Sequence, residues 1–269
     1  MRPKTIVVAE IGENHIGDMD LARKMLVEAA KAGADIVKFQ SYRGEDVAEG
    51  DPEKEWFTKV ALPDTMHFEL KRLAEQQGVE FMSSPFSLER AQFLCEELGL
   101  KKIKIASSEM LNMSLLDYVN ERAETVFLST GMATLTEIQE ALGHLGKVKT
   151  CYILHCVTQY PAQPEDANLG VITTLRTVFP NHPIGYSDHT LGVQAVVTAV
   201  ALGAQVIEKH FTLDKDLPGT DHLLSVTPDE LNQMIRQIRQ VEILLGDPVK
   251  KPTRGEREII QFVRSRFPK

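Results

Sequence analysis

The chain has 269 residues, of which 43% are hydrophobic and 25% are charged, so it is long enough to bury a complete globular core. Its formal net charge of -8 offers no basic surface to a polyphosphate, which argues against a nucleic-acid-binding protein. We find no signal peptide and no apolar run of roughly 18 to 20 residues, so we expect no membrane association. Three cysteines without a CxxC spacing indicate neither a disulfide framework nor a cysteine zinc site, and we expect a cytoplasmic protein.

Short apolar runs rich in β-branched residues alternate with longer segments of helical periodicity as far as Gly246. Each run is followed by such a segment, for example residues 19–32, which Gly33 closes. Eight strand–helix units in a chain of this length are typical of a (β/α)8 TIM barrel, whose usual size is about 250 residues. The eight predicted strands are residues 5–11, 35–40, 79–83, 102–106, 125–129, 150–157, 183–187 and 205–210.

A doubly wound open sheet is the alternative fold. An open sheet would gather its polar residues at one switch point, whereas here polar residues follow nearly every predicted strand. That distribution favours an α/β protein with a (β/α)8 barrel, which we predict over residues 1–246. The long connection at 41–63, which contains the sole tryptophan, we interpret as a lid or a subunit contact. Residues 247–269 are predicted to form a tail with one or two amphipathic turns.

Two lysines, Lys38 and Lys104, lie near the carboxyl ends of predicted strands. Because side chains alternate along a strand, both lysines would point into the barrel. A lysine inside a barrel is costly unless it meets an anion, so the pair suits a phosphate and a carboxylate. The alternative is that each lysine pairs with a structural carboxylate such as Glu10 or Asp35.

Polar loops follow several other predicted strands. The first strand ends in AEIGENHIGD, where Asn14 and His15 lie between two glycines that would let the backbone approach a ligand closely. The segments FMSSPFS and STGMAT carry hydroxyls near predicted helix N-termini, which bind anions well. Ser87 and Thr134 in these segments are expected to act as ordinary N-caps.

Two histidines follow neighbouring strands of the predicted barrel, His189 in YSDHT and His210 in IEKHFT. Two imidazoles at adjacent strand ends can share a divalent metal, with water and substrate filling the other positions. The alternative is that each is a hydrogen-bonded core histidine. The groups near them in sequence that would suit a carboxylate-rich Mn, Mg or Zn site are Asp188, Glu208, Asp221 and His222.

Three further residues have a chemical and a structural interpretation. Glu109 lies just after Lys104 and would transfer protons there, or simply neutralise the lysine. Tyr160 follows the sixth strand and would donate a hydrogen bond, or serve packing alone. Cys156 is adjacent to His155, but neighbours in a strand point to opposite faces, so a Cys–His nucleophile is not predicted.

Taken in order, the motifs AEIGENHIGD, ADIVKFQ, FMSSPFS, KIKIASSE, STGMAT, LHCVTQYPA, IGYSDHT, IEKHFT and PGTDHLLS resemble those of the sialic acid synthase family. The resemblance covers residues 7–256 and includes all eight predicted strand ends. It implies an enzyme that condenses phosphoenolpyruvate with an N-acylated amino sugar and releases phosphate by C–O cleavage. Members make N-acetylneuraminate, its 9-phosphate, or the related legionaminic and pseudaminic acids, on a barrel followed by a small antifreeze-like domain.

The resemblance also implies roles for individual residues. Glu109 would handle the proton transfers, and His189 and His210 would ligate a divalent metal, Mn with Mg or Co as alternatives. Phosphoenolpyruvate would be held by Lys38, Lys104, Ser83, Ser107, Ser129 and Ser187. The acceptor sugar and the reacting hydroxyls would be positioned by Tyr160, Thr158, Asp221, Asn14 and His15.

Two departures from the family pattern bear on the acceptor and on partners. Ile16 replaces a polar residue that contacts the sugar in some members. The last residues, FVRSRFPK, resemble the family's linker into the antifreeze-like domain, which is swapped across a homodimer and contributes an arginine to the partner's sugar pocket. We therefore expect a homodimer, or a separate antifreeze-like protein as partner. The alternative functions are a phosphoenolpyruvate-dependent synthase for another aldose or aldose phosphate, and a non-catalytic sugar-binding relative.

Overall fold

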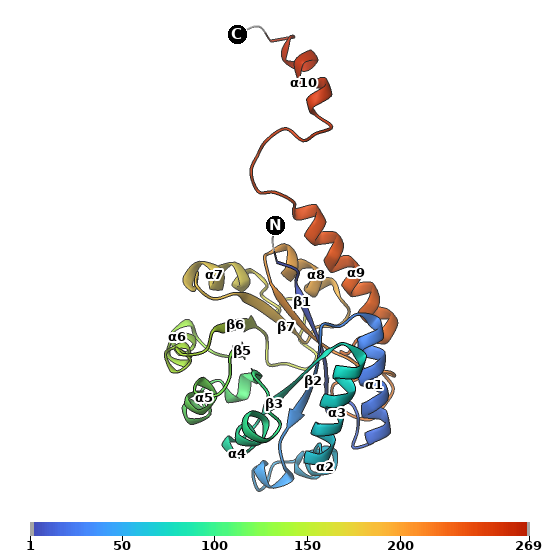
Figure 1. Ribbon diagram of the computed structural model, residues 1–269, viewed down its shortest axis with the longest axis vertical. Coiled ribbons are helices and arrows are strands. Elements are labelled where there is room, and N and C mark those ends of the chain that lie inside the picture. The colour runs from blue at the N-terminus through green and yellow to red at the C-terminus, as the bar shows by residue number, and fades with distance from the viewer. Residues whose placement is uncertain (1–2, 268–269) are drawn as a thin grey trace.

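Eight parallel strands form the centre of the computed structural model, which describes residues 3–267 (Figure 1). Ladder pairing runs in the order β3-β2-β1-β8-β7-β6-β5-β4, and β3 contacts β4 across the remaining seam, so the sheet is a nearly closed barrel. The predicted (β/α)8 fold is confirmed. The strands are β1 (Ile6–Gly12), β2 (Ile36–Ser41), β3 (Glu80–Pro85), β4 (Lys102–Ile105), β5 (Thr125–Ser129), β6 (Thr150–His155), β7 (Ile184–Asp188) and β8 (Val206–His210).

Helices surround the strands (Figure 1). None of the helices in the described part of the chain is both long enough and apolar enough to cross a bilayer. The helices are α1 (Met19–Ala32), α2 (Lys54–Val60), α3 (Asp64–Gln77), α4 (Leu88–Gln92), α5 (Met113–Asn120), α6 (Leu135–His144), α7 (Gly170–Val178), α8 (Gln194–Ala201), α9 (Pro228–Leu245) and α10 (Arg257–Arg264). Short turns are η1 (Gly44–Asp46), the π-helical η2 (Phe93–Glu97) and η3 (Ser107–Glu109).

Local sequence signals set several helix ends. The predicted helix at 19–32 is observed as α1, and Gly33 ends it with a φ of 104°. Ser87 caps α4 by accepting from the backbone N–H of Arg90. Thr134 caps α6 through a reciprocal pair of hydrogen bonds with Glu137. The expectation that Ser87 and Thr134 are N-caps is confirmed.

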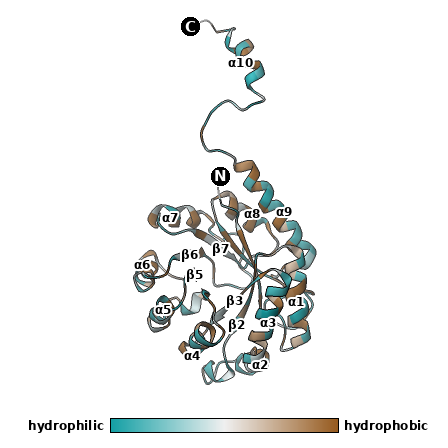
Figure 2. Ribbon diagram, in the orientation of Figure 1, coloured by the Kyte–Doolittle hydropathy of each residue, from teal (hydrophilic) through white to brown (hydrophobic). Residues whose placement is uncertain are grey.

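Two segments lie outside the regular strand–helix repeat. The long connection at 41–63 folds into η1 and α2, and its Glu53 and Phe57 line the cavity described below. The tail at 247–269, of which residues 268 and 269 lie outside the described part, contains α10 and extends away from the barrel (Figure 1). Its hydrophobic and hydrophilic residues lie on different faces of the helix (Figure 2), and Phe262 is exposed. The predicted amphipathic turns are confirmed.

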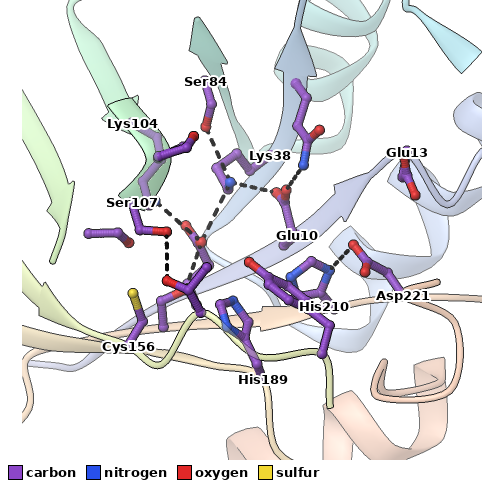
Figure 3. A pocket seen from close by; sticks show the side chains of 18 of the residues that line it. Glu10, Glu13, Lys38, Ser84, Lys104, Ser107, Cys156, His189, His210 and Asp221 are labelled. Carbon is purple, nitrogen blue, oxygen red and sulfur yellow. Dashed lines mark hydrogen bonds and ion pairs between the residues drawn. The ribbon is translucent and has the colours of Figure 1, made fainter. Parts of the chain in front are cut away.

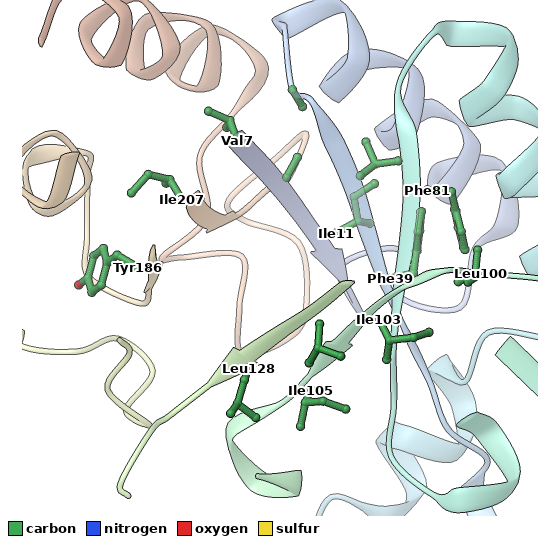
Figure 4. Close-up of a cluster of buried hydrophobic side chains, with 14 of the residues drawn as sticks. Val7, Ile11, Phe39, Phe81, Leu100, Ile103, Ile105, Leu128, Tyr186 and Ile207 are labelled. Atoms are coloured by element: carbon green, nitrogen blue, oxygen red, sulfur yellow. The ribbon is translucent and has the colours of Figure 1, made fainter. Parts of the chain in front are cut away.

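Alternation along the strands separates two apolar regions. Outward-facing residues such as Val7, Ile11 and Phe39 pack under the surrounding helices (Figure 4). Inward-facing residues fill one end of the barrel with a second cluster, the apolar plug, made of Val8, Ile36, Met82, Phe127, Leu154 and Val206. Because side chains on one face recur every second residue, the next inward positions lie one layer closer to the carboxyl ends. Those positions are Glu10, Lys38, Ser84, Ser129 and Glu208.

Buried histidines make the stability of the fold sensitive to acid. Burial lowers the pKa of both His15 and His67 to about 4. Protons then bind more tightly to the unfolded chain, so the free energy of unfolding should fall as pH drops from 6.5 to 4. Each such histidine accounts for roughly 3 kcal/mol over that range. Urea unfolding at a series of pH values measures the slope.

His67 lies on α3 with its Nδ1 3.1 Å from the Pro63 carbonyl oxygen, and its side chain is fully buried. The variant His67→Gln should flatten the dependence of the free energy of unfolding on acid. A slope equal to that of the wild type would contradict the assignment.

Candidate active site

A cavity of about 370 Å³ lies at the carboxyl ends of the strands, directly above the apolar plug. Figure 3 shows the side chains that line it. Ten of the residues proposed from the sequence line it: Lys38, Lys104, Ser107, Ser129, Thr158, Tyr160, Ser187, His189, His210 and Asp221. Residues from distant parts of the sequence therefore converge where barrels of this type build their active sites.

The two lysines reach the centre of this cavity. Nζ of Lys38 lies 2.9 Å from Oε2 of Glu10 and 3.5 Å from Oε1 of Glu208. Nζ of Lys104 lies 3.7 Å from the same oxygen of Glu208 and donates to the Ile105 carbonyl. The lysines thus point inward as predicted, and they also pair with carboxylates, as the alternative interpretation supposed. Two lysines and two carboxyl groups therefore lie together, each with a side chain that is at most 4% exposed.

Burial sets the protonation of this group of four. Burial would raise the pKa of Glu208, but Lys104 and Lys38 lower it to about 2, so Glu208 is ionised. Burial raises the pKa of Glu10 above its ordinary value. Burial would lower the pKa of Lys38, but Glu10 and Glu208 raise it, whereas burial lowers the pKa of Lys104. Neighbouring carboxylates therefore offset the positive charge of Lys104 less than that of Lys38, and an incoming anion would pair with Lys104 more readily.

Two glycines let the loops approach these side chains. Gly12 has a φ of +52°, and a Cβ there would lie 3.0 Å from Oε1 of Glu10. Gly131 has a φ of +48°, and its Cβ would lie 2.5 Å from Cβ of Ser107 and 2.6 Å from Oγ1 of Thr158. Ser107 and Thr158 are themselves hydrogen-bonded at 3.3 Å. A side chain at either glycine would push apart groups that line the cavity.

The histidine pair occupies the β7–β8 side of the cavity. The ring centroids of His189 and His210 are 5.4 Å apart, and the Tyr160 ring stacks on His189 with centroids 4.1 Å apart. Nδ1 of His189 lies 2.6 Å from the Val157 carbonyl oxygen, and Nδ1 of His210 lies 3.2 Å from Oδ2 of Asp221. With each Nδ1 turned to an acceptor, Nε2 is the nitrogen left for a ligand.

This arrangement fits a metal bound by two imidazoles. The described residues contain no group of three or more His, Cys, Asp or Glu side chains placed to hold an ion, so water and substrate would complete the coordination. Burial and the neighbouring His210 lower the pKa of His189 to about 4, which keeps that imidazole neutral. Burial would lower the pKa of His210, but Asp221 raises it. The carboxylate–histidine contact is typical of residues that support metal ligands.

The other acidic group beside these histidines faces away from the cavity. Asp188 is fully buried on the outer side of β7, where its Oδ2 lies 2.8 Å from Nζ of Lys209. Its Oδ1 accepts from Tyr186 Oη and from both the backbone N–H and the hydroxyl of Thr190. Asp188, suggested from sequence as part of the metal site, is instead a structural group that fixes the chain on both sides of His189.

Asn14 and His15 do not line the cavity. Nδ2 of Asn14 donates to the Phe211 carbonyl and to Oγ of Ser225, which fastens the first loop to the segment after β8. His15 is buried, and its Nδ1 accepts from the Gly17 backbone N–H. Both residues therefore shape the loop, and their contact with the sugar stays a prediction.

Ser83 and Glu109 also lie outside the lining. Ser83 lies between the inward-facing Met82 and Ser84, so it faces outward and donates to the Phe39 carbonyl. Ser84 faces inward instead, and its Oγ lies 3.3 Å from Nζ of Lys38. The carboxylate of Glu109 accepts from Asn112 on its own loop. The predicted place of Ser83 in the site is corrected, because alternation turns its side chain to the outer face. Glu109 is outside the lining, and its role in proton transfer stays a prediction.

Several lining residues had no predicted contact with substrate. Glu10 was expected only as a partner for the lysines, and Glu208 only as part of a metal site, yet both lie on the same strand faces as the plug, so the period of two places them in the lining. Gln40 follows Lys38 on β2 by the same period, whereas Glu13 and Glu53 come from loops, where no period applies. Cys156 also lines the cavity, and burial raises the pKa of its thiol, which supports the prediction that it is inert.

The fold and the cavity together define a (β/α)8-barrel enzyme whose central lysines suit an anionic substrate. Residues 25–250 match the model of the NeuB family. An uncharacterized protein of Methanocaldococcus jannaschii is 44% identical over 95% of this chain and 76% of its own length. The N,N'-diacetyllegionaminic acid synthase of Campylobacter jejuni is 41% identical over 97% of this chain and 83% of its own.

The solved structures agree. The N-acetylneuraminic acid synthetase of Leptospira borgpetersenii, crystallised with citrate, superposes with a TM-score of 0.93 at 34% identity, covering 98% of this chain and 92% of that one. The chain belongs to the NeuB family of sugar-acid synthases. The predicted family membership is thereby confirmed.

Proposed function

We propose that the protein condenses phosphoenolpyruvate with an N-acylated amino sugar to give a nonulosonic acid and inorganic phosphate. The observation that carries this proposal is the convergence of Lys38, Lys104 and the histidine pair in one cavity. The lysines at one end of the cavity suit an anion, and the histidines on the neighbouring side suit a metal that would activate a carbonyl group. The names of the NeuB relatives, which are synthases of legionaminic and neuraminic acids, support the same reaction class.

In this proposal the donor occupies the lysine side. Lys38 and Lys104 neutralise the phosphate and carboxylate of phosphoenolpyruvate, and Lys104 is the better placed of the two because it has fewer carboxylate partners. The hydroxyls of Ser84, Ser107 and Ser129 lie in the same lining and would donate to the phosphate oxygens. The side chains of both lysines are buried, and opposite charges attract each other more strongly in a protein interior than in water.

The acceptor occupies the histidine side. His189 and His210 would hold a divalent metal, Mn in our proposal with Mg or Co as alternatives. When bound, the metal would supply Lewis acidity to the sugar aldehyde. Asp221 fixes the ring of His210 through Nδ1, and Tyr160 packs on His189. These contacts hold the imidazoles in place before substrate arrives.

The proposed steps conserve atoms and protons. Carbon 3 of phosphoenolpyruvate forms a bond to the aldehyde carbon, whose oxygen takes a proton to become a hydroxyl. Water adds at carbon 2 and gives up a proton, which replaces the one delivered to the aldehyde oxygen. The bond between carbon 2 and the phosphate oxygen then breaks, and the hydroxyl at carbon 2 loses its proton to the departing phosphate and becomes the keto group. Glu10, whose pKa is raised by burial, is our candidate to hold and deliver the proton, in place of Glu109. Ionised Glu208 would stabilise positive charge at carbon 2.

The direct test is phosphate release from phosphoenolpyruvate across an acceptor panel. The panel contains N-acetylmannosamine, its 6-phosphate, diacetamido sugars and simple aldose phosphates, each with and without Mn. Release with an N-acyl amino sugar supports the proposal. Release with only a simple aldose phosphate would favour the alternative synthase, and tight phosphoenolpyruvate binding without release would favour a non-catalytic relative.

Metal removal should have a large effect. Protein stripped with a chelator should lose at least about 100-fold in phosphate release and regain it with added Mn. His210→Ala should lose activity to a similar extent without rescue by metal, whereas His144→Ala, on α6 away from the cavity, should behave as wild type. Mn affinity followed by electron paramagnetic resonance provides an independent readout. Full activity of His210→Ala would contradict the metal proposal.

A further inference from the structure

The ladder between β7 and β8 ends one residue before the histidine pair. Its last two partners are Asp188 and Lys209, whose side chains lie on the outer face of the barrel. Beyond them β8 continues to His210, which pairs with Glu10 on β1, whereas the chain leaves β7 before His189. Strand pairing therefore fixes the backbone of His210 but does not fix that of His189 relative to it.

A buried turn continues from Asp188 and carries His189 at its centre. Oδ1 of Asp188 accepts from the backbone N–H of Thr190 at 2.9 Å and from the Thr190 hydroxyl at 2.8 Å. This is an Asx turn, in which a side-chain oxygen takes the place of a backbone acceptor. The turn holds the residues on both sides of His189 after the ladder has ended.

Lys209 joins this turn to β8. Its Nζ lies 2.8 Å from Oδ2 of Asp188 and donates to the Thr190 carbonyl. Lys209 immediately precedes His210, so one side chain connects the strand end that carries one histidine to the turn that carries the other. The ring centroids of the two histidines lie 5.4 Å apart in this arrangement.

Stability alone does not account for an ion pair at this position. Both side chains are fully buried, and taking two charges out of water can cost more than their attraction returns. Apolar residues of similar volume are often as stable or more stable in place of such a pair. Apolar side chains could not, however, form directed hydrogen bonds to the N–H and the carbonyl of Thr190. The pair therefore supplies geometry that packing would not.

We propose that Lys209 and Asp188 are positioning residues, which set the spacing of His189 and His210 for one divalent metal. This inference rests on the proposed function, because the metal belongs to that proposal. The pair lies outside the cavity lining and acts through the backbone beside the histidines. Loosening the pair should weaken metal binding while leaving the lysine side of the cavity unchanged.

The test measures the affinity for Mn by electron paramagnetic resonance, in protein without substrate. Asp188→Asn keeps an acceptor oxygen for Thr190 but removes the charge that pairs with Lys209. It should raise the Kd for Mn at least about tenfold, as when other groups that support metal ligands are changed. Because this variant leaves Lys209 buried without a counter-ion, thermal melting must show that it folds, and a variant that keeps both charges is measured beside it.

Thr190→Val keeps both charges and removes the hydroxyl that Asp188 accepts from. It should raise the Kd for Mn at least about threefold, with KM for phosphoenolpyruvate changed less than about twofold. Thr190→Ser retains a hydroxyl and should bind Mn within about twofold of wild type. Ile238→Val, in the buried core on α9 and outside the cavity lining, is the control for a general loss of stability. It should lower the melting temperature and leave the Kd for Mn within about twofold of wild type.

Weaker Mn binding in Thr190→Val that Thr190→Ser restores would support the inference. Four results would overturn it: wild-type Mn affinity in Thr190→Val, the same affinity in Asp188→Asn that folds, an equal loss in Thr190→Ser or Ile238→Val, or no Mn binding by the wild type. Because Mn binding is measured without turnover, the absence of phosphate release with every acceptor would reject the proposed function and leave this measurement to decide the inference. Phosphate release by the wild type, with unchanged Mn affinity in the variants, would reject the inference alone.

Discussion

Replacing Lys104 by methionine should abolish most phosphate release. Lys104 is 3% exposed and has one carboxylate neighbour at 3.7 Å. Burial lowers the pKa of Lys104, and Lys104 in turn lowers the pKa of the buried Glu208. Thermal melting of the variant shows whether the fold tolerates the loss of this charge. Activity should fall by about 100- to 1000-fold, the range seen when one group that stabilises reacting charge is removed.

Lys102→Met provides the matched control for this prediction. Lys102 lies two residues earlier on β4, is 39% exposed, and pairs with Glu80 at the protein surface. The same chemical change there should leave kcat and KM for phosphoenolpyruvate within about twofold of wild type, because surface ion pairs contribute little. If Lys104→Met retained most of its activity, or if both variants lost it equally, Lys104 would not be the anion-binding group.

The largest loss of stability is expected for Lys209→Met. Lys209 is fully buried, and it pairs with Asp188 and donates to the Thr190 carbonyl. The variant leaves the carboxylate of Asp188 buried without its counter-ion, which should lower the free energy of unfolding by about 3 to 5 kcal/mol. Urea denaturation with a fixed m-value measures the change.

Two further variants separate the ion pair from the loss of a long side chain. Lys215→Met removes a partly exposed pair with Glu230 and should change stability by less than about 1 kcal/mol. The double variant Asp188→Asn/Lys209→Met removes both charges and should be more stable than Lys209→Met alone. A double variant that is less stable than the single one would show that packing, rather than an unpaired charge, explains the loss.

Periodicity in the sequence is sufficient to predict the barrel. The eight apolar runs and the capping residues are local signals, and each predicted strand is present in the structure. The predicted ends are less accurate where polar residues extend a strand. β3 runs on through Ser84 to Pro85, and Ser84 is the serine that faces Lys38. Applying the period of two from Met82 would have favoured Ser84.

The loops at the mouth of the barrel could not be predicted in the same way. Asn14 contacts Phe211 and Ser225, which lie about two hundred residues further along the chain. Such pairings depend on the tertiary fold, and nothing in the local pattern specifies them. Glu13 was missed for the same reason, because only the folded chain brings it close to Asp221 and Trp56.

The apolar plug has a consequence for the order of events. It seals the barrel beneath Glu10, Lys38 and Glu208, so molecules can enter and leave the cavity only from the loop side. Lys38 and Lys104 lie within strands, whereas Glu13 and Asp221 lie in the loops beyond the strand ends. A molecule bound at the lysines therefore lies deeper in the cavity than one bound among the loops. With one entrance, we expect phosphoenolpyruvate to bind before the acceptor, and product-inhibition kinetics would measure that order.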